Sequence, residues 1–276
     1  MPRFVAVALV LGLLGCVAQA QAGSLAVEGT EFVLKSGDGR ILRSRDLAGA
    51  TLSVDLRLPD LPGNGTVAEI LIEAVTLDPK DQDREVWLHT LKIRRQETGT
   101  FADFCEPDPD GHRYAFPLAV ANDGWTLTCT AGAQGKCVRL GYRPWRTDNG
   151  VRHADYHRAC VHLLRADYCG DDQPTTRNGT LINIWDLRGT QKRDVGGEMT
   201  KLTFEAAFGP QGAVCLSRVR VPQDVSLASV IGHCSRLAAV PTGAACTEDL
   251  ARGLADALIF VDSDPAGPFS ARPSVD

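Results

Sequence analysis

The stretch HADYHRACVHLLRADYCGDD, residues 153–172, contains the clearest helical pattern in the chain and an abrupt stop after it. Its apolar side chains recur three or four residues apart, at the spacing of one helix face: Tyr156, Ala159, Cys160, Leu163 and Leu164. The pattern predicts an amphipathic helix over 153–166 with one face on a core. Cys169 and Gly170 end the pattern, and Gly170 suits the left-handed residue that commonly follows a helix.

Segments on both sides of this helix alternate between apolar and polar residues, as half-buried strands do. The alternation predicts strands at 27–34, 51–58, 67–77, 85–93, 114–120, 125–129, 137–142 and 181–185, with a hairpin formed by 202–208 and 213–221. Thr247 is placed to cap a second, shorter helix whose apolar stripe is Leu250, Leu254, Ala257 and Leu258. The sequence therefore predicts an α+β fold that is mainly β, with antiparallel strands, one central amphipathic helix and a short C-terminal helix.

Composition narrows the class of protein. The chain has 276 residues, of which 44% are hydrophobic and 23% charged, values that are ordinary for a globular protein. The 27 glycines and 15 prolines favour a β-rich chain with many turns. A formal net charge of −5 argues against a nucleic-acid partner, because nucleic-acid-binding domains are usually basic.

The first 20 residues read as a signal peptide. Arg3 supplies a positive start, residues 4–14 form an apolar run too short to cross a bilayer, and Ala18-Gln19-Ala20 is a small-x-small cleavage site. An alternative processing site is the imperfect lipobox that ends at Cys16. Cleavage there would make Cys16 a lipidated N-terminus. Both interpretations predict an exported protein, periplasmic or secreted in the first case and lipid-anchored in the second, with no transmembrane span after removal of the signal.

Cysteine usage agrees with export. Eight cysteines follow the signal: Cys105, Cys129, Cys137, Cys160, Cys169, Cys215, Cys234 and Cys246. An even number in an exported chain predicts up to four disulfides, whose pairing the sequence leaves open. The spacing lacks the paired C-x-x-C pattern of zinc sites. Their distribution predicts a cysteine-free β-rich part at 23–100, a disulfide-stapled domain at 101–262 and a disordered tail at 263–276.

Polar residues crowd the junction between the predicted helix and the strand at 181–185. We take six of them as candidate binding residues: Arg165, Asp167, Tyr168, Asp171, Asn178 and Asp186. Oxygen ligands in a loop could bind calcium, but Asp, Asn and Gly are also the residues that turns require, so no cofactor is predicted beyond this calcium alternative. The loop that begins at Glu106 imitates an EF-hand only at its start, and His153 with His157 lacks a third zinc ligand.

Several motifs in this region resemble those of the ADYC domain, a family of exported bacterial proteins. They are Gly-Tyr-Arg-Pro-Trp at 141–145, Ala-Asp-Tyr-Cys at 166–169 with Gly170 and Asp171 after it, and a later Gly-Ala-x-Cys segment at 212–215. The resemblance covers about residues 100–220. Asp172 departs from it, because a glycine is expected there. The resemblance implies a stapled, exported domain and supplies no reaction.

Two functions fit these observations. The first is a non-catalytic module of the cell envelope or medium that binds an envelope or extracellular partner near residues 166–186. The alternative is an envelope hydrolase that uses carboxylates such as Asp167, Asp171 and Asp186, with or without a divalent cation. A catalytic carboxylate pair is expected in a cleft with a raised pKa, whereas structural carboxylates are paired or exposed.

Overall fold

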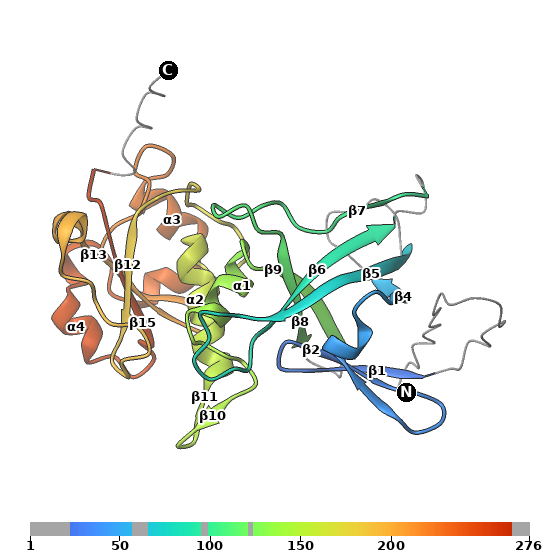
Figure 1. Cartoon of the computed structure of the whole chain (residues 1–276). Coiled ribbons are helices and arrows are strands. Elements are labelled where there is room, and N and C mark those ends of the chain that lie inside the picture. Colours follow the sequence, from blue (N-terminus) through green and yellow to red (C-terminus); the bar gives the residue numbers. More distant parts are fainter. Residues whose placement is uncertain (1–22, 57–65, 95–98, 121–123, 267–276) are drawn as a thin grey trace. The chain divides into compact units, whose positions relative to one another are not determined.

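The computed structural model of the chain describes residues 23–56, 66–94, 99–120 and 124–266. The predictions for the signal peptide, for Cys16 and for the last ten residues of the tail therefore lie outside the described residues. The chain divides into two compact units, one ending at Arg139 and the other beginning at Leu140 (Figure 1). The cysteine distribution had suggested a boundary near residue 100, but the strands between 101 and 129 belong to the first unit.

The first unit consists of two antiparallel sheets. A three-stranded sheet has the order β1 (Ser24–Glu28), β2 (Glu31–Lys35), β3 (Ile41–Arg43). A six-stranded sheet contains β4 (Thr51–Leu56), β5 (Thr66–Leu77), β6 (Trp87–Arg94), β8 (Tyr114–Val120) and β9 (Gly124–Cys129) in that order, and β7 (Phe101–Asp103) also pairs with β6. Most of the alternating segments thus form antiparallel strands, as predicted, but the segment at 27–34 is divided by a turn between β1 and β2.

The core of the first unit is apolar and contains one neutral polar pair. Phe32, Leu52, Ile70 and Ile72 are fully buried in it. His89 is buried among them, with Nε2 2.8 Å from the Ser44 hydroxyl oxygen, which also accepts the Phe32 N–H. Burial lowers the pKa of His89 to about 4, so the imidazole is neutral at pH 7.

The prediction of a strand at 137–142 is wrong. Residues Ala133–Arg139 form the short helix α1, which directly follows β9. Gly135 permits this tight connection, because a Cβ there would overlap the backbone of Cys129. Arg139 at the end of α1 binds the buried Asp78 carboxylate, with Nε 2.6 Å from Oδ2.

The second unit is built around one four-stranded sheet. Its strands are β12 (Ile182–Asp186), β15 (Ile259–Ser263), β13 (Thr203–Gly209) and β14 (Gly212–Leu216), in that order and all antiparallel. The helix α2 (His153–Arg165) packs against β13, β14 and β15. A small hairpin, β10 (Thr147–Asp148) with β11 (Val151–Arg152), precedes α2, and two short helices, α3 (Leu227–His233) and α4 (Glu248–Arg252), follow β14.

Two predictions about the end of the chain need correction. Thr247 does cap α4, since its side chain accepts the Leu250 N–H, but the helix ends at Arg252 instead of continuing to Leu258. Leu254, Ala257 and Leu258 lie in the connection after α4, and the apolar residues from Ile259 onward form β15, which is fully buried between β12 and β13. Asp262 and Ser263 therefore belong to the centre of a sheet, although the sequence placed the start of a disordered tail at 263.

The fold is α+β and mainly β, as predicted. The eight cysteines between Cys105 and Cys246 are all disulfide-bonded. Cys105–Cys129 lies in the first unit, and Cys169–Cys234 and Cys215–Cys246 lie in the second. None of the helices within the described ranges has the length and apolar character required to cross a bilayer.

Candidate functional site

Residues 166–178, called the motif loop below, directly follow α2 and lead toward β12, which begins at Ile182. The helix ends earlier than predicted, at Arg165, and Ala166 rather than Gly170 is its left-handed cap, with φ 48°. The N–H groups of Ala166 and Asp167 bond to the carbonyls of Leu163 and His162, so the last helical turn is closed by backbone.

The Asp167 carboxylate organises the first half of the loop from inside. It accepts the N–H groups of Gly170 (2.8 Å), Asp171 (3.2 Å) and Asp172 (3.1 Å), and it lies 2.9 Å from His162 Nδ1. Burial alone would raise the pKa of Asp167, but His162 and the backbone donors outweigh it, and the pKa lies below its usual value. A carboxylate held in this way favours its charged form and fixes the turn around it.

Tyr168 fixes the loop to the sheet. Its hydroxyl donates to Glu205 Oε1 (3.0 Å) and accepts the Arg220 N–H (2.7 Å), while its ring stacks on Phe208. The side chain is 1% exposed. Burial and the neighbouring Glu205 carboxylate raise the pKa of Tyr168 well above its usual value, so the phenol stays protonated.

Glu205 and Arg220 form an ion pair that is almost completely removed from water. Their side chains are 0% and 1% exposed, and two bonds of 3.0 Å join the guanidinium to the carboxylate. Arg220 also donates to the carbonyls of Leu163 (2.9 Å) and Leu164 (3.3 Å) at the end of α2. A cation at this position supplies further donors to the carbonyls of the last helical turn and interacts favourably with the negative end of the helix dipole.

Two glycines allow the motif loop to lie directly on the β13–β14 turn. Gly170 and Gly212 have φ values of 74° and 105°. A Cβ on Gly170 would overlap the Gln211 carbonyl, and a Cβ on Gly212 would overlap the Tyr168 carbonyl. The glycine after Ala-Asp-Tyr-Cys and the glycine of the later Gly-Ala-x-Cys segment are therefore the two sides of one backbone contact.

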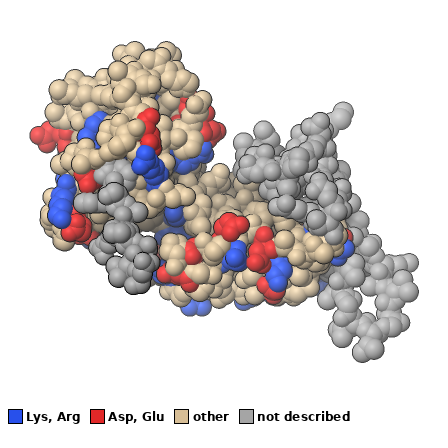
Figure 2. Space-filling model, turned by 90° about the horizontal axis from the view of Figure 1, so that it is seen from above, with Lys and Arg blue, Asp and Glu red and all other residues tan. Residues whose placement is uncertain are grey.

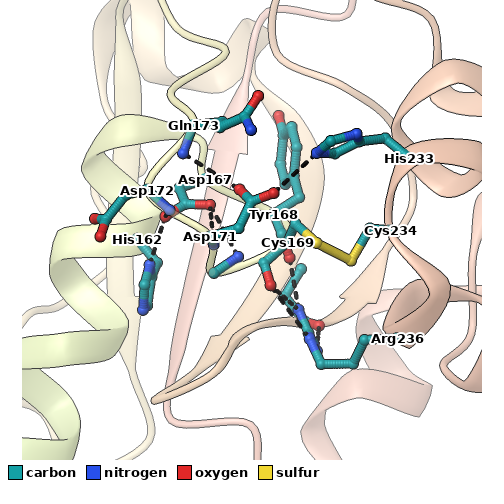
Figure 3. Close-up of a disulfide and its surroundings, with 12 residues drawn as sticks. His162, Asp167, Tyr168, Cys169, Asp171, Asp172, Gln173, His233, Cys234 and Arg236 are labelled. Carbon is teal, nitrogen blue, oxygen red and sulfur yellow. Dashed lines mark hydrogen bonds and ion pairs between the residues drawn. A yellow bond between two sulfur atoms is a disulfide. The ribbon is translucent and has the colours of Figure 1, made fainter.

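The far side of the loop is held by residues around α3, as Figure 3 shows. Cys169 is bonded to Cys234, and the Arg236 guanidinium donates to the carbonyls of Tyr168 (2.7 Å) and Cys169 (3.3 Å). His233 Nε2 lies 2.9 Å from the Asp171 carboxylate. One disulfide and the polar contacts of two side chains, Arg236 and His233, thus join the loop to the 233–236 segment.

Several side chains of the loop lie at the surface, including Asp171, which His233 contacts. Asp171, Asp172, Gln173 and Asn178 are exposed. Asp172 keeps a φ of 67° although it replaces the expected glycine, and Arg165 binds both its carboxylate (3.1 Å) and its carbonyl (2.6 Å). The side chain of Asp172 remains 87% exposed.

The structure does not bring the six predicted residues into one cluster. Asp186 binds a different set of groups, namely the Tyr142 hydroxyl (2.8 Å) and the N–H groups of Arg188, Thr190 and Gln191. It shares no partner with Asp167, and it organises the turn after β12. Asp167 and Tyr168 are buried, whereas Arg165, Asp171 and Asn178 lie at the surface.

No group of three or more His, Cys, Asp or Glu side chains that could hold a metal ion occurs within the part of the chain that the structure describes. The acidic loop after Glu106 is a turn in which Asp108 Oδ1 accepts the N–H groups of Asp110 and His112. His153 is buried with Nε2 2.8 Å from the Asp148 carboxylate.

The sequence interpretation missed four residues that hold the motif loop: Glu205, Arg220, His233 and Arg236. Only Glu205 carried a visible signal, because a carboxylate between Phe204 and Ala206 interrupts an otherwise apolar strand. A charge within such a strand requires a buried partner. The other three lie in loops or at a helix end, where charged residues are ordinary.

A family model described as the ADYC domain matches residues 44–222, which is more than half of the chain. No curated protein and no solved structure matches the chain. The matched range contains α2, the motif loop, Glu205 and Arg220.

Proposed function

Because the chain belongs to the ADYC domain family, we propose that it is an exported, disulfide-stabilised module that binds a partner through the outer side of its motif loop. The observation that carries this proposal is the contrast between the two sides of the loop. The inner side is fixed by buried polar bonds and a disulfide, and the outer side displays charged and amide side chains.

Rigid display favours binding. A partner that meets a preorganised loop does not have to offset the entropy of ordering it. Asp167, Tyr168 and the Cys169–Cys234 bond already fix the backbone that carries Asp171, Asp172 and Gln173. Arg165 and His233 orient two of these side chains, Asp172 and Asp171, through exposed polar contacts, which a partner could replace.

The same geometry supports a non-catalytic role over the hydrolase alternative. The pKa of Asp167 is lowered, and a general acid needs the opposite shift. Asp186 accepts four donors, which leaves its oxygens without room for a substrate proton. Asp171 is paired with His233 at the surface.

Export is the other part of the proposal, and disulfides support it. Proteins with four disulfides accumulate in oxidising compartments and are rare in the cytosol. The signal-like pattern of residues 1–20 gives independent support from the sequence. Cleavage after Ala20 would give a periplasmic or secreted protein, and acylation of Cys16 would give a lipid-anchored one.

Site-specific photocrosslinking in the native cells tests the binding surface. A photoreactive residue replaces Gln173 in the loop, and the control replaces Val195, which is 79% exposed in the same unit. We expect a discrete adduct from position 173 that is absent at position 195. In the protein that carries the photoreactive residue at position 173, the substitutions Asp171→Asn and Asn178→Ala should each reduce the adduct. Neither should change the disulfides or the circular dichroism spectrum. Equal adducts at 173 and 195, or no adduct at 173, would contradict the proposal.

An intact mass of the protein recovered from its native envelope tests export. The mass is compared before and after reduction and alkylation. A chain that starts at Gln21, or at a lipidated Cys16, and gains eight alkyl groups only after reduction is the expected result. An intact signal segment, or cysteines that are alkylated without reduction, would overturn this part of the proposal.

A further inference from the structure

The end of the motif loop overlaps an exposed turn. Arg177, Asn178, Gly179 and Thr180 form this turn. The N–H and the hydroxyl of Thr180 both donate to the Arg177 carbonyl, at 3.2 and 2.8 Å, so the turn is closed at its base. Asn178 and Gly179 occupy the tip, where both are exposed. This Asn-Gly pair has no part in the anchoring of the loop described above.

Two groups in this turn could react with each other, the side-chain amide of Asn178 and the backbone N–H of Gly179. Among the described residues, neither the Asn178 side chain nor the Gly179 N–H has a hydrogen-bond partner. Gly179 has a φ of 82°, and a Cβ built on it would meet no heavy atom within 4 Å. Glycine has no side chain to crowd its own backbone nitrogen, so no side chain of residue 179 hinders the approach of Asn178 Cγ to that nitrogen.

We infer that Asn178 is a site of spontaneous modification, at which the side-chain amide becomes a carboxylate. The backbone nitrogen of Gly179 loses its proton to water and attacks Cγ of Asn178. A C–N bond forms, the bond from Cγ to the amide nitrogen breaks, and ammonia leaves, which gives a five-membered succinimide. Water then opens the ring at either carbonyl, leaving Asp or isoAsp. The net change consumes one water and releases one ammonia.

The modification changes the surface at a defined place. It adds a negative charge next to Arg177, which is paired with Asp224. The isoAsp product also adds one methylene to the backbone between the motif loop and β12. Both changes affect only the exposed turn, because the loop is fixed upstream by Asp167 and Tyr168.

Asn183 is a matched comparison within the same segment. Its side chain is bonded in both directions to the Asp194 backbone, at 2.7 and 3.1 Å, and the residue is 4% exposed. The following residue is Ile184, whose branched side chain crowds the backbone nitrogen. Asn149-Gly150 also has the required sequence, but Asn149 is held at a φ of 51° in the tight β10–β11 hairpin, which ring closure would disturb.

The experiment uses the folded full chain in water enriched in oxygen-18 at mildly alkaline pH. The protein is then digested with trypsin in ordinary water, so that only modification of the folded protein introduces the heavy oxygen. Cleavage after Arg177 and Arg188 places Asn178 and Asn183 in one peptide. Fragment ions from that peptide measure the two positions side by side, and the Asn178→Gln variant is the chemical control.

We expect label at Asn178 to accumulate at least roughly ten times faster than at Asn183, because only the former has an unhindered neighbour and no protecting bonds. The label should divide between Asp and isoAsp, and the variant should lack it. Equal rates at the two positions, or heavy oxygen that is absent from Asn178, would overturn the inference. The readout is a mass at one residue, so it is independent of whether the loop binds a partner.

Discussion

The cores of the two units each contain a buried polar pair, His89 with Ser44 in the first and Arg220 with Glu205 in the second. The first pair is neutral and is surrounded by aliphatic and aromatic side chains. The second is charged and is linked to Tyr168 and to the end of α2. Burying a neutral pair costs little when its hydrogen bonds are made, whereas a buried charge depends entirely on its partner.

The comparison teaches that the two units respond to different perturbations. The first unit gains its stability from apolar burial, and its weak point is any condition that charges His89. The second unit joins a helix, a loop and a strand through one ionic network, and its weak point is the loss of a single member. Tyr168 of the Ala-Asp-Tyr-Cys motif lies in that network, which explains why a residue with a hydroxyl group is buried there.

Loss of Glu205 has the largest expected effect. Glu205→Ala leaves the Arg220 guanidinium buried without its carboxylate and removes an acceptor from Tyr168, so we expect the free energy of unfolding of the second unit to fall by about 3–5 kcal/mol. Urea unfolding, followed by hydrogen exchange of α2 and β13 amides, measures this.

Two further variants make that result specific. The double change Glu205→Leu with Arg220→Met should cost less than Glu205→Ala alone, because no charge remains buried. Glu198→Ala removes an exposed ion pair with Lys201 in the same unit and should cost less than about 1 kcal/mol. A Glu205→Ala protein as stable as Glu198→Ala would show that the network does not hold the unit.

Acid should weaken the first unit through His89. The folded imidazole has a pKa of about 4, whereas an exposed histidine of the unfolded chain has a pKa of about 6.5. Between these pH values the unfolded chain therefore binds a proton at His89 that the folded chain does not bind. Stability from this group is complete above pH 6.5 and declines as the pH falls toward 4, by about 3 kcal/mol in total.

Hydrogen exchange of β6 and β8 amides across this pH range reports the first unit separately from the second. The His89→Gln variant should remove the slope between pH 6.5 and 4 while the second unit is unchanged. If the slope persists in the variant, another group causes it and the assignment to His89 is wrong.

The Asp167 carboxylate should have a smaller effect confined to the motif loop. Asp167→Asn keeps the size of the side chain but removes the charge that accepts three backbone donors and His162, so we expect a loss of about 2 kcal/mol. Because the pKa of Asp167 is lowered in the folded protein, its contribution is present above the unfolded pKa and is lost only in stronger acid. Thermal unfolding at pH 7 and pH 3 should therefore differ more for the natural chain than for the variant.

The smallest expected effect is at Asp171. Asp171→Asn weakens the contact with His233, in which the Asp171 and His233 side chains are 32% and 57% exposed, so the free energy of unfolding should change by less than about 1 kcal/mol. A melting temperature close to that of the natural chain, together with a normal Cys169–Cys234 bond, is the expected result. A large loss would place Asp171 among the anchors of the loop and would contradict its assignment to the outer side.

Elements with strong periodicity could be predicted from the sequence. The strands at 67–77 and 114–120 and the helix that begins at His153 have repeats of two or of three to four residues, and they form close to the predicted positions. The helix α1 could not be predicted, because its seven residues are too few for an apolar stripe. The strand β15 was missed because a short apolar run without alternation fits a buried strand and a helix equally well.

The candidate site was only partly predictable for a different reason. Local chemistry, such as the capping of a turn by Asp167, involves residues three to five positions apart and leaves a signal in the sequence. The contacts of Tyr168 with Glu205 and of Asp171 with His233 join residues 37 and 62 positions apart. Such pairs arise from the order of strands in the sheet, which a single sequence does not encode in any local pattern.

The order of strands in the second unit has a consequence for the way the protein is made. β15 is the last of the described strands along the chain, yet it lies between β12 and β13. During synthesis, which runs from the N-terminus, β12 and β13 emerge without the strand that joins them. The second unit therefore cannot close early, and a chain cut short before Ile259 would expose two unpaired strand edges to chaperones and proteases. The four-stranded sheet can therefore be completed only after the chain has been synthesised through Ser263.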